Sequence, residues 1–336
     1  MYRLRDFSLL VMLAATAAVM PALGQTRASA GSADGGAGGG STLLPSVPDL
    51  SGTWGRYSFP GLASPLSGPG PVTNKSRRRQ SFDDNGRPFA GGAAAANAPL
   101  VSNNTQLVGD YSNPILKPPA GKVVKEHGEI ELGGWPAPNP ANECWPSGVP
   151  FVLWNLGMRV LQQPDQITFV YVFDHEVRHV RLNQTHPAQL TPSWFGDSVG
   201  HYEGDTLVID TVGFKVGRFS MVDHYGTPHT EALHVVERYR VADYEVAKEA
   251  LVRDAKENFR FNPRANDYAL MVDPTFRGKH LLLDLTIEDP GVFTTPWSAT
   301  VIYQPASGEW PEFVCPENPH ELARKSSIPI ADKPDF

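Results

Sequence analysis

The sequence is poor in cysteine, in charged residues and in long apolar runs. Two of its 336 residues are cysteines and 19% are charged, with a formal net charge of −7. An acidic balance lacks the basic footprint of nucleic-acid-binding proteins, and no apolar run after residue 24 is long enough to span a membrane. We therefore expect neither nucleic acid nor a membrane span for the mature chain.

Motifs with known chemistry are missing as well. The sequence has no Walker loop, no dinucleotide-binding glycine pattern and no helical HExxH zinc motif. Ser198, between Gly196 and Gly200, lacks the strand–turn–helix context of a serine-hydrolase elbow. We expect no organic cofactor and no metal centre, with one metal alternative given below.

Glycine and proline, in contrast, are abundant at 31 residues each, a density that argues against a long helical bundle. The composition changes along the chain and predicts five segments. They are a signal peptide at 1–24, a flexible linker at 25–47, a Pro/Gly-rich extended region packing on the barrel at 48–120, a β-barrel domain at 121–325 and a tail at 326–336.

The amino terminus has the three parts of a secretory signal. Arg3 and Arg5 precede an apolar stretch at 9–19, and small residues then precede Gln25. We expect a periplasmic or secreted protein. Two cysteines in an exported chain favour a disulfide between Cys144 and Cys315, although two free thiols or half of a metal site would use the same residues.

Short stretches rich in β-branched and apolar residues alternate with turn signals after Cys144. They predict strands near Trp54 and at 157–163, 167–173, 176–182, 199–202, 206–212, 233–240, 280–288, 297–303 and 312–315. Helical spacing predicts a short helix at 122–131 and an inserted amphipathic helix at 244–259. This order predicts a mainly β protein, an antiparallel barrel or sandwich.

Strand periodicity assigns the odd-numbered residues of 206–212, 233–240, 280–288 and 297–303 to the core face. Glu237 falls on that face, where a carboxylate must be paired or protonated. Arg159, Arg178 and Arg181 are candidate partners. Extended backwards, the same strand places His229 and Glu231 on the core face and His234 on the outer one.

Polar residues on a core-facing parity suggest an acid/base site. We hypothesise a hydratase, lyase or isomerase type of enzyme acting on a small apolar organic molecule in a barrel cavity. Its catalytic residues would be His229, Glu231, Asp223 and Glu237. Its substrate-binding residues would be Trp194, Tyr239, Trp297 and His224, with the connection around Trp194 as an alternative lid.

Two other functions use the same residues. The first is a non-catalytic binding protein for a small apolar ligand, in which aromatic side chains dominate the affinity. The second is a metal-dependent enzyme that uses the cluster at 223–231, which is rich in histidine and carboxylates. The sequence leaves the choice open, together with the oligomeric state.

Two resemblances support an exported barrel. The motifs PSWFGDSVGHYEGDTLVIDTVGF at 192–214, GTPHTEALHVVER at 226–238 and VFTTPW at 292–297 resemble a large family of exported bacterial proteins without an assigned activity. Gly52-Thr53-Trp54 resembles the first-strand Gly-x-Trp of lipocalin-like barrels. The second resemblance implies a ligand-holding barrel, and by analogy acid/base chemistry on apolar substrates.

Overall fold

The structure is a computed structural model. It describes residues 47–56, 58–59, 61–81, 95–103, 105–154, 157–260, 270, 272–273, 275–308, 310 and 315. The predicted signal peptide, nearly all of the predicted linker, the tail and most of the predicted strand at 312–315 lie outside these residues.

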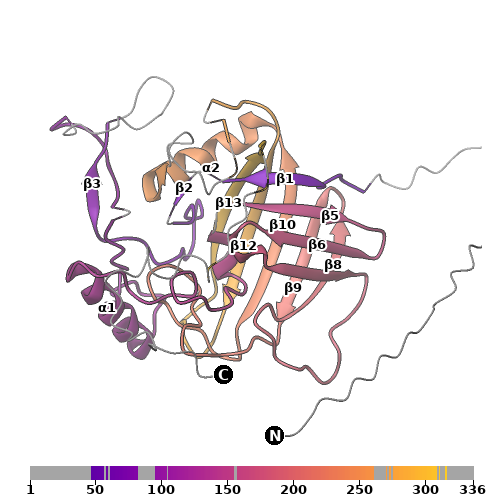
Figure 1. The fold of residues 1–336 in the computed structure, drawn as a ribbon, viewed down its shortest axis with the longest axis horizontal. Coiled ribbons are helices and arrows are strands. Elements are labelled where there is room, and N and C mark those ends of the chain that lie inside the picture. Colours follow the sequence, from indigo (N-terminus) through magenta and orange to yellow (C-terminus); the bar gives the residue numbers. More distant parts are fainter. Residues whose placement is uncertain are drawn as a thin grey trace, which may run out of the picture. The chain divides into compact units, whose positions relative to one another are not determined.

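Nine strands form a closed barrel, so the barrel alternative of the sequence analysis is confirmed over the sandwich (Figure 1). Around the ring the order is β1-β13-β12-β10-β9-β8-β7-β6-β5, and β5 pairs again with β1. The strands are β1 Gly52–Gly55, β5 Gly157–Gln162, β6 Gln166–Tyr171, β7 Val177–Leu182, β8 Asp197–Glu203, β9 Thr206–Val212, β10 His234–Ala242, β12 His280–Glu288 and β13 Trp297–Pro305.

One neighbouring pair, β7 and β8, is parallel, whereas the others are antiparallel. Nine strands cannot alternate in direction all the way around a closed ring, so one such pair is required. A parallel pair needs a long connection that returns the chain to the starting end. Residues 183–196 make this return and are called the crossover segment below.

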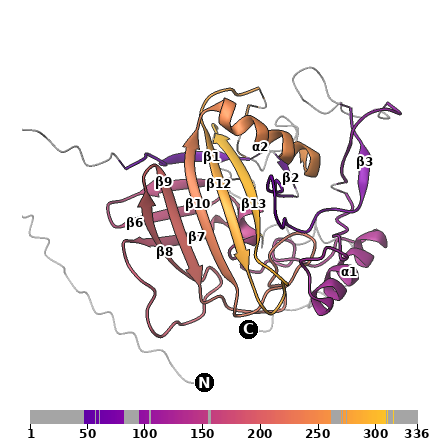
Figure 2. The same cartoon turned by 180° about the vertical axis from the view of Figure 1, so that it is seen from behind.

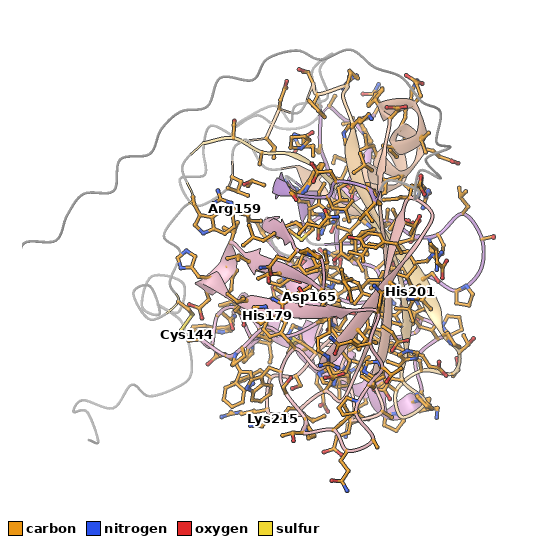
Figure 3. The ribbon with its side chains drawn as sticks, turned by 90° about the vertical axis from the view of Figure 1, so that its right-hand side faces the viewer. Cys144, Arg159, Asp165, His179, His201 and Lys215 are labelled. Carbon is orange, nitrogen blue, oxygen red and sulfur yellow. A yellow bond between two sulfur atoms is a disulfide. The ribbon has the colours of Figure 1, made fainter. Side chains whose placement is uncertain are left out.

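The barrel interior follows the predicted strand periodicity. Odd-numbered side chains of β9, β10, β12 and β13 are buried in the main hydrophobic core. The β8–β9 hairpin turns at Gly204, whose φ of 63° favours glycine. Three exposed side chains of the outer face, Arg159, His179 and His201, are labelled in Figure 3.

Two helices lie outside the barrel wall (Figure 2). The inserted helix α2, Tyr244–Glu257, packs Ala247 and Ala250 against Leu282 and Ile302 on the outer face of β12 and β13. Helix α1, Pro118–Leu132, contains the predicted helix at 122–131 and begins with proline, as helix starts allow. The remaining elements are the pairs β2 Ser58–Phe59 with β11 Phe259–Arg260 and β3 Arg77–Arg79 with β4 Leu100–Ser102, and the 3₁₀ turns η1 Phe151–Trp154 and η2 Phe173–His175.

The two cysteines form the predicted disulfide, Cys144–Cys315, with a Cα–Cα distance of 5.4 Å (Figure 3). A disulfide is consistent with an oxidising compartment outside the cytoplasm. Neither helix of the described region has the length and apolar character needed to cross a bilayer.

One face assignment from the sequence is wrong. Strand β10 begins at His234, and the turn at 230–233 precedes it. The carboxylate of Asp289 accepts hydrogen bonds from the backbone N–H and the hydroxyl of Thr230, at 2.6 and 2.8 Å, which ends the extended backbone there. As a result, Glu231 is exposed instead of facing the core.

Candidate functional site at the plugged end of the barrel

The candidate site lies at the barrel end where residues 172–176, 213–233 and 289–296 connect the strands. The turn η1 sits at this end, and all four of its side chains are at most 1% exposed. Tyr303 Oη donates to the carbonyl of Leu153 at 3.1 Å, and Trp154 Nε1 donates to the carbonyl of Val222 at 2.8 Å. Because η1 is tied both to β13 and to the 213–233 connection, we call this the plugged end.

A buried ion pair crosses the barrel interior next to the plug. Arg178 of β7 meets Glu237 of β10 with two hydrogen bonds, of 3.1 and 2.5 Å. Ser198 and Thr211 accept from the same guanidinium at 3.1 and 2.8 Å, and Tyr239 Oη donates to Glu237 at 2.8 Å. Burial opposes the charge of Arg178, but Glu237 outweighs it and holds the pKa of Arg178 above its usual value.

This arrangement decides which arginine pairs with Glu237 and where Ser198 lies. Among the three predicted arginines, Arg178 is the partner of Glu237. Ser198 lies within β8 and bonds to Arg178, so the structure does not present it on the sharp turn of a nucleophile elbow. Both carboxylate oxygens of Glu237 are occupied, which matches the structural alternative of a buried pair that ties two sides of the barrel together.

Tyr171 lies beside this pair and differs from Tyr239 in one respect. Its side chain is 1% exposed, and its hydroxyl lies next to the Arg178 guanidinium but donates its own proton to no described residue. Burial raises the pKa of Tyr171, so the phenol is neutral. The ring stacks on Phe195 of the crossover segment, with centroids 6.0 Å apart.

A second polar group belongs to the 213–233 connection. Asp223 accepts hydrogen bonds from the backbone N–H groups of Tyr225 and Thr227, at 2.8 and 3.1 Å, and burial raises its pKa to about 6. Burial lowers the pKa of His224 to about 3 and that of His127, on α1, to about 4, so both imidazoles are neutral. His224 packs on the ring of Phe151 of the plug, 4.5 Å between centroids, which retains it as a candidate contact residue.

The predicted catalytic residues do not come together in one cluster. His229 is partly buried, bonds to the carbonyl of Thr230 at 3.1 Å, and burial lowers its pKa. Glu231 is exposed. No hydrogen bond among the described residues joins any two of His229, Glu231, Asp223 and Glu237, and each keeps separate neighbours.

The predicted aromatic contacts fall into two places. Tyr239 and Trp297 face the barrel interior, and Trp297 packs edge-on against Phe293 at 5.7 Å. Trp194 is only half-buried and packs instead against Trp145, 5.3 Å between centroids, next to the disulfide loop.

Sequence reasoning missed Glu176, which follows η2 at the plugged end. Its Oε1 accepts from the backbone N–H of Ser147 at 2.7 Å, and the Ser147 hydroxyl also bonds to this carboxyl group. Burial raises the pKa of Glu176 to about 7. Strand periodicity could not indicate that Glu176 is buried, because this residue precedes β7. Its partner Ser147 belongs to the loop that follows Cys144, far away in the sequence.

Buried donor hydrogens without an acceptor concentrate at this end of the barrel. Within the described residues, the donor hydrogens without an acceptor at this end are those of Tyr171 Oη, Trp297 Nε1, Trp145 Nε1, and Arg56 Nε and Nη1. In native proteins about 90% or more of such atoms are satisfied. A concentration of this kind indicates groups that await water or a ligand.

The described residues contain no group of three or more histidine, cysteine, aspartate or glutamate side chains placed to hold a metal ion. The cluster at 223–231 therefore does not assemble into a metal centre in this structure. Together, the fold and this end of it define a closed β-barrel protein with a plugged, polar-lined end. No protein-family model, curated protein or solved structure matches the chain.

Proposed function

We propose that the protein binds a small, uncharged and largely apolar organic molecule at the plugged end of its barrel. The observation that carries the proposal is a set of buried donor hydrogens without an acceptor in the described chain, those of Tyr171 Oη, Trp297 Nε1, and Arg56 Nε and Nη1. Aromatic rings of Phe195 and Phe293 pack beside the first two. An apolar molecule with one or two acceptor oxygens matches donors set among rings.

Charge balance supports an uncharged ligand. Each buried arginine already has a carboxylate, Arg178 with Glu237 and Arg56 with Asp254 at 3.4 Å. The neighbouring tyrosines and His224 are neutral at pH 7. A ligand with its own charge would be desolvated without a free counter-ion, which is costly in a buried site.

Three probes of similar size test this proposal: acetophenone, benzoate and ethylbenzene. They share a ring and differ in carrying a neutral acceptor, an anionic acceptor or none. Calorimetry or ligand-detected NMR on the mature protein should show acetophenone binding best. If none of the three binds, the proposed function is wrong; if benzoate or ethylbenzene binds best, the assigned ligand chemistry is wrong.

Tyr171 and Tyr239 provide a matched pair of variants. Tyr171→Phe removes a hydroxyl whose proton has no protein acceptor, so it should lower stability less than Tyr239→Phe and weaken acetophenone about 3- to 10-fold, the value of one hydrogen bond. Tyr239→Phe removes a hydroxyl bonded to Glu237, so it should mainly lower stability. Equal effects of the two variants on affinity would contradict the assignment of Tyr171.

A second candidate function is acid/base catalysis on the same ligand. It is favoured by two carboxyl groups at the plugged end, Glu176 and Asp223, whose pKa values burial raises to about 7 and about 6. Such values suit proton transfer near neutral pH. In this version either carboxylate would remove a proton from a carbon next to a carbonyl, and the same group would return it.

Deuterium exchange tests this chemistry without knowledge of the natural substrate. A base near bound acetophenone takes a methyl proton to give the enolate, and reprotonation from D₂O places deuterium on that carbon. Exchange above background should fall in Glu176→Gln or Asp223→Asn and persist in Glu231→Ala, whose site is exposed. Loss of exchange in both His229→Ala and Glu231→Ala would instead support His229 and Glu231 as the catalytic residues, as strand periodicity predicted.

A further inference from the structure

His186 of the crossover segment lies between two carboxylates on the outer face of the barrel. Its Nδ1 is 2.6 Å from Asp197 Oδ1, on β8, and its Nε2 is 3.0 Å from Asp210 Oδ1, on β9. A neutral imidazole carries one N–H, and an ionised carboxylate only accepts. Both contacts are therefore hydrogen bonds only when His186 is protonated.

Further charged groups surround the two carboxylates that His186 contacts. Arg181 of β7 donates two hydrogen bonds to Asp197, at 2.7 and 3.0 Å. His234 of β10 lies 2.9 Å from Asp210 and 3.9 Å from Glu288 of β12. Hydrogen bonds from Arg181 lower the pKa of Asp197, and those from His234 and His186 outweigh burial to lower that of Asp210. Both carboxylates remain charged where histidine titrates.

Just before His186, Arg181 of β7 holds the crossover segment by donating to Gln184 Oε1 at 3.1 Å and to the carbonyl of Thr185 at 3.5 Å. The backbone of the segment pairs at its two ends, where Asn183 donates to Gly200 at 2.7 Å and Ser193 donates to Gly213 at 3.1 Å. No backbone N–H of residues 184–192 donates to a backbone carbonyl within the described chain. Arg181 thus holds residues 184 and 185, and the two contacts of His186 fasten the next part of the segment to the barrel wall.

The same segment covers the proposed binding end. Phe195 stacks on Tyr171, whose hydroxyl proton has no acceptor among the described residues, and Trp194 packs on Trp145. We propose that His186 is a proton-dependent latch, which holds the crossover segment over the plugged end when protonated and releases it when neutral. The control of ligand access rests on the proposed function, whereas the latch itself does not.

Fluorine NMR of 5-fluorotryptophan-labelled protein tests the latch. Trp194→Phe assigns the Trp194 signal among the seven tryptophans. Between pH 5 and 8 this signal should move in the wild type and stay fixed in His186→Gln. His201→Gln is the matched control, because His201 is an exposed histidine on β8 whose contact is with Glu203. A pH-dependent signal that persists in His186→Gln, or is absent from the wild type, overturns the latch.

Acetophenone binding tests the control of access. Its association rate should rise with pH in the wild type and in His201→Gln, and should be pH-independent in His186→Gln. A pH-independent rate in the wild type, together with a moving Trp194 signal, overturns the control of access. Absence of acetophenone binding at every pH counts against the proposed function, while the fluorine signal still decides the latch.

Discussion

Glu176 shows how burial sets the chemistry of a single residue. Burial outweighs the two hydrogen bonds from Ser147, and the negative charge of Asp174 adds to it, so the pKa of Glu176 rises to about 7. The folded state therefore binds a proton that the unfolded state releases near pH 4.5. Stability contributed by the protonated form is full below pH 4.5 and is lost as the pH rises to about 7.

Glu176→Gln should remove this pH dependence. The variant should match the wild type near pH 4.5 and exceed its free energy of unfolding by about 1–3 kcal/mol above pH 7, since one pKa unit corresponds to about 1.4 kcal/mol. Urea denaturation at several pH values measures the difference. Glu249→Gln on the exposed face of α2 is the control, and a pH-independent gain in Glu176→Gln would show that ionisation is not the cause.

The Arg178–Glu237 pair predicts strong coupling between two residues. Arg178→Met or Glu237→Gln alone leaves a buried charge without its partner and should cost about 3–5 kcal/mol. The double variant should be more stable than the sum of the single losses by at least about 2 kcal/mol. Denaturant midpoints of the four proteins give the coupling energy, and additive losses would mean that the pair is not energetically linked.

At the scale of elements, periodicity predicted the strands that form hairpins or have one buried face. Burial alternates along most of β10, as the sequence indicates, whereas β9, β12 and β13 also bury part of their outer face; α2 covers β12 and β13 there. Periodicity did not predict that β7 pairs in parallel with β8. The direction of neighbouring strands depends on how all nine close into a ring, and the sequence of a single strand carries no information about that. The limit of β10 was also missed, since Asp289, far along the chain, ends the extended backbone at Thr230.

The candidate site was predicted in part for the same reason. Asp223, His224, Tyr239 and Trp297 do lie at or near the plugged end, because their own segments place them there. Tyr171, Glu176 and Arg56 were missed, since their neighbours Phe195, Ser147 and Asp254 come from distant parts of the chain. Long-range packing of this kind leaves no signal in a single strand.

The tight turn of the 213–233 connection predicts a sensitive glycine. Gly226 has φ 78°, and a Cβ there would lie 2.4 Å from His127 Cγ. Gly226→Ala should therefore cost about 2–4 kcal/mol, from both backbone strain and contact with α1. Gly204→Ala has a similar φ of 63° with open space around its Cβ and should cost about 1–2 kcal/mol. Thermal unfolding compares them, and equal losses would exclude the contact with His127.

At the scale of the whole molecule, the disulfide joins residues 171 positions apart and encloses eight of the nine barrel strands. Replacing both Cys144 and Cys315 with serine should destabilise the protein by about 5 kcal/mol in the chain-entropy description. Reducing agent should have the same effect on the wild type and none on the variant. A loss well below 1 kcal/mol would show that the loop is already constrained in the unfolded state.

Closure of the barrel depends on β1, the one wall strand outside the disulfide loop. Its register with β13 consists of two pairs, Trp54↔Pro305 and Gly55↔Gln304, and proline has no N–H to donate. This join is narrower than that of β10 with β12, which runs from His234↔Glu288 to Ala242↔His280. Opening it converts a ring without edges into an open sheet whose free edge invites pairing with other chains. In hydrogen–deuterium exchange, the backbone amides of β1 should therefore exchange faster than those of β10 and β12.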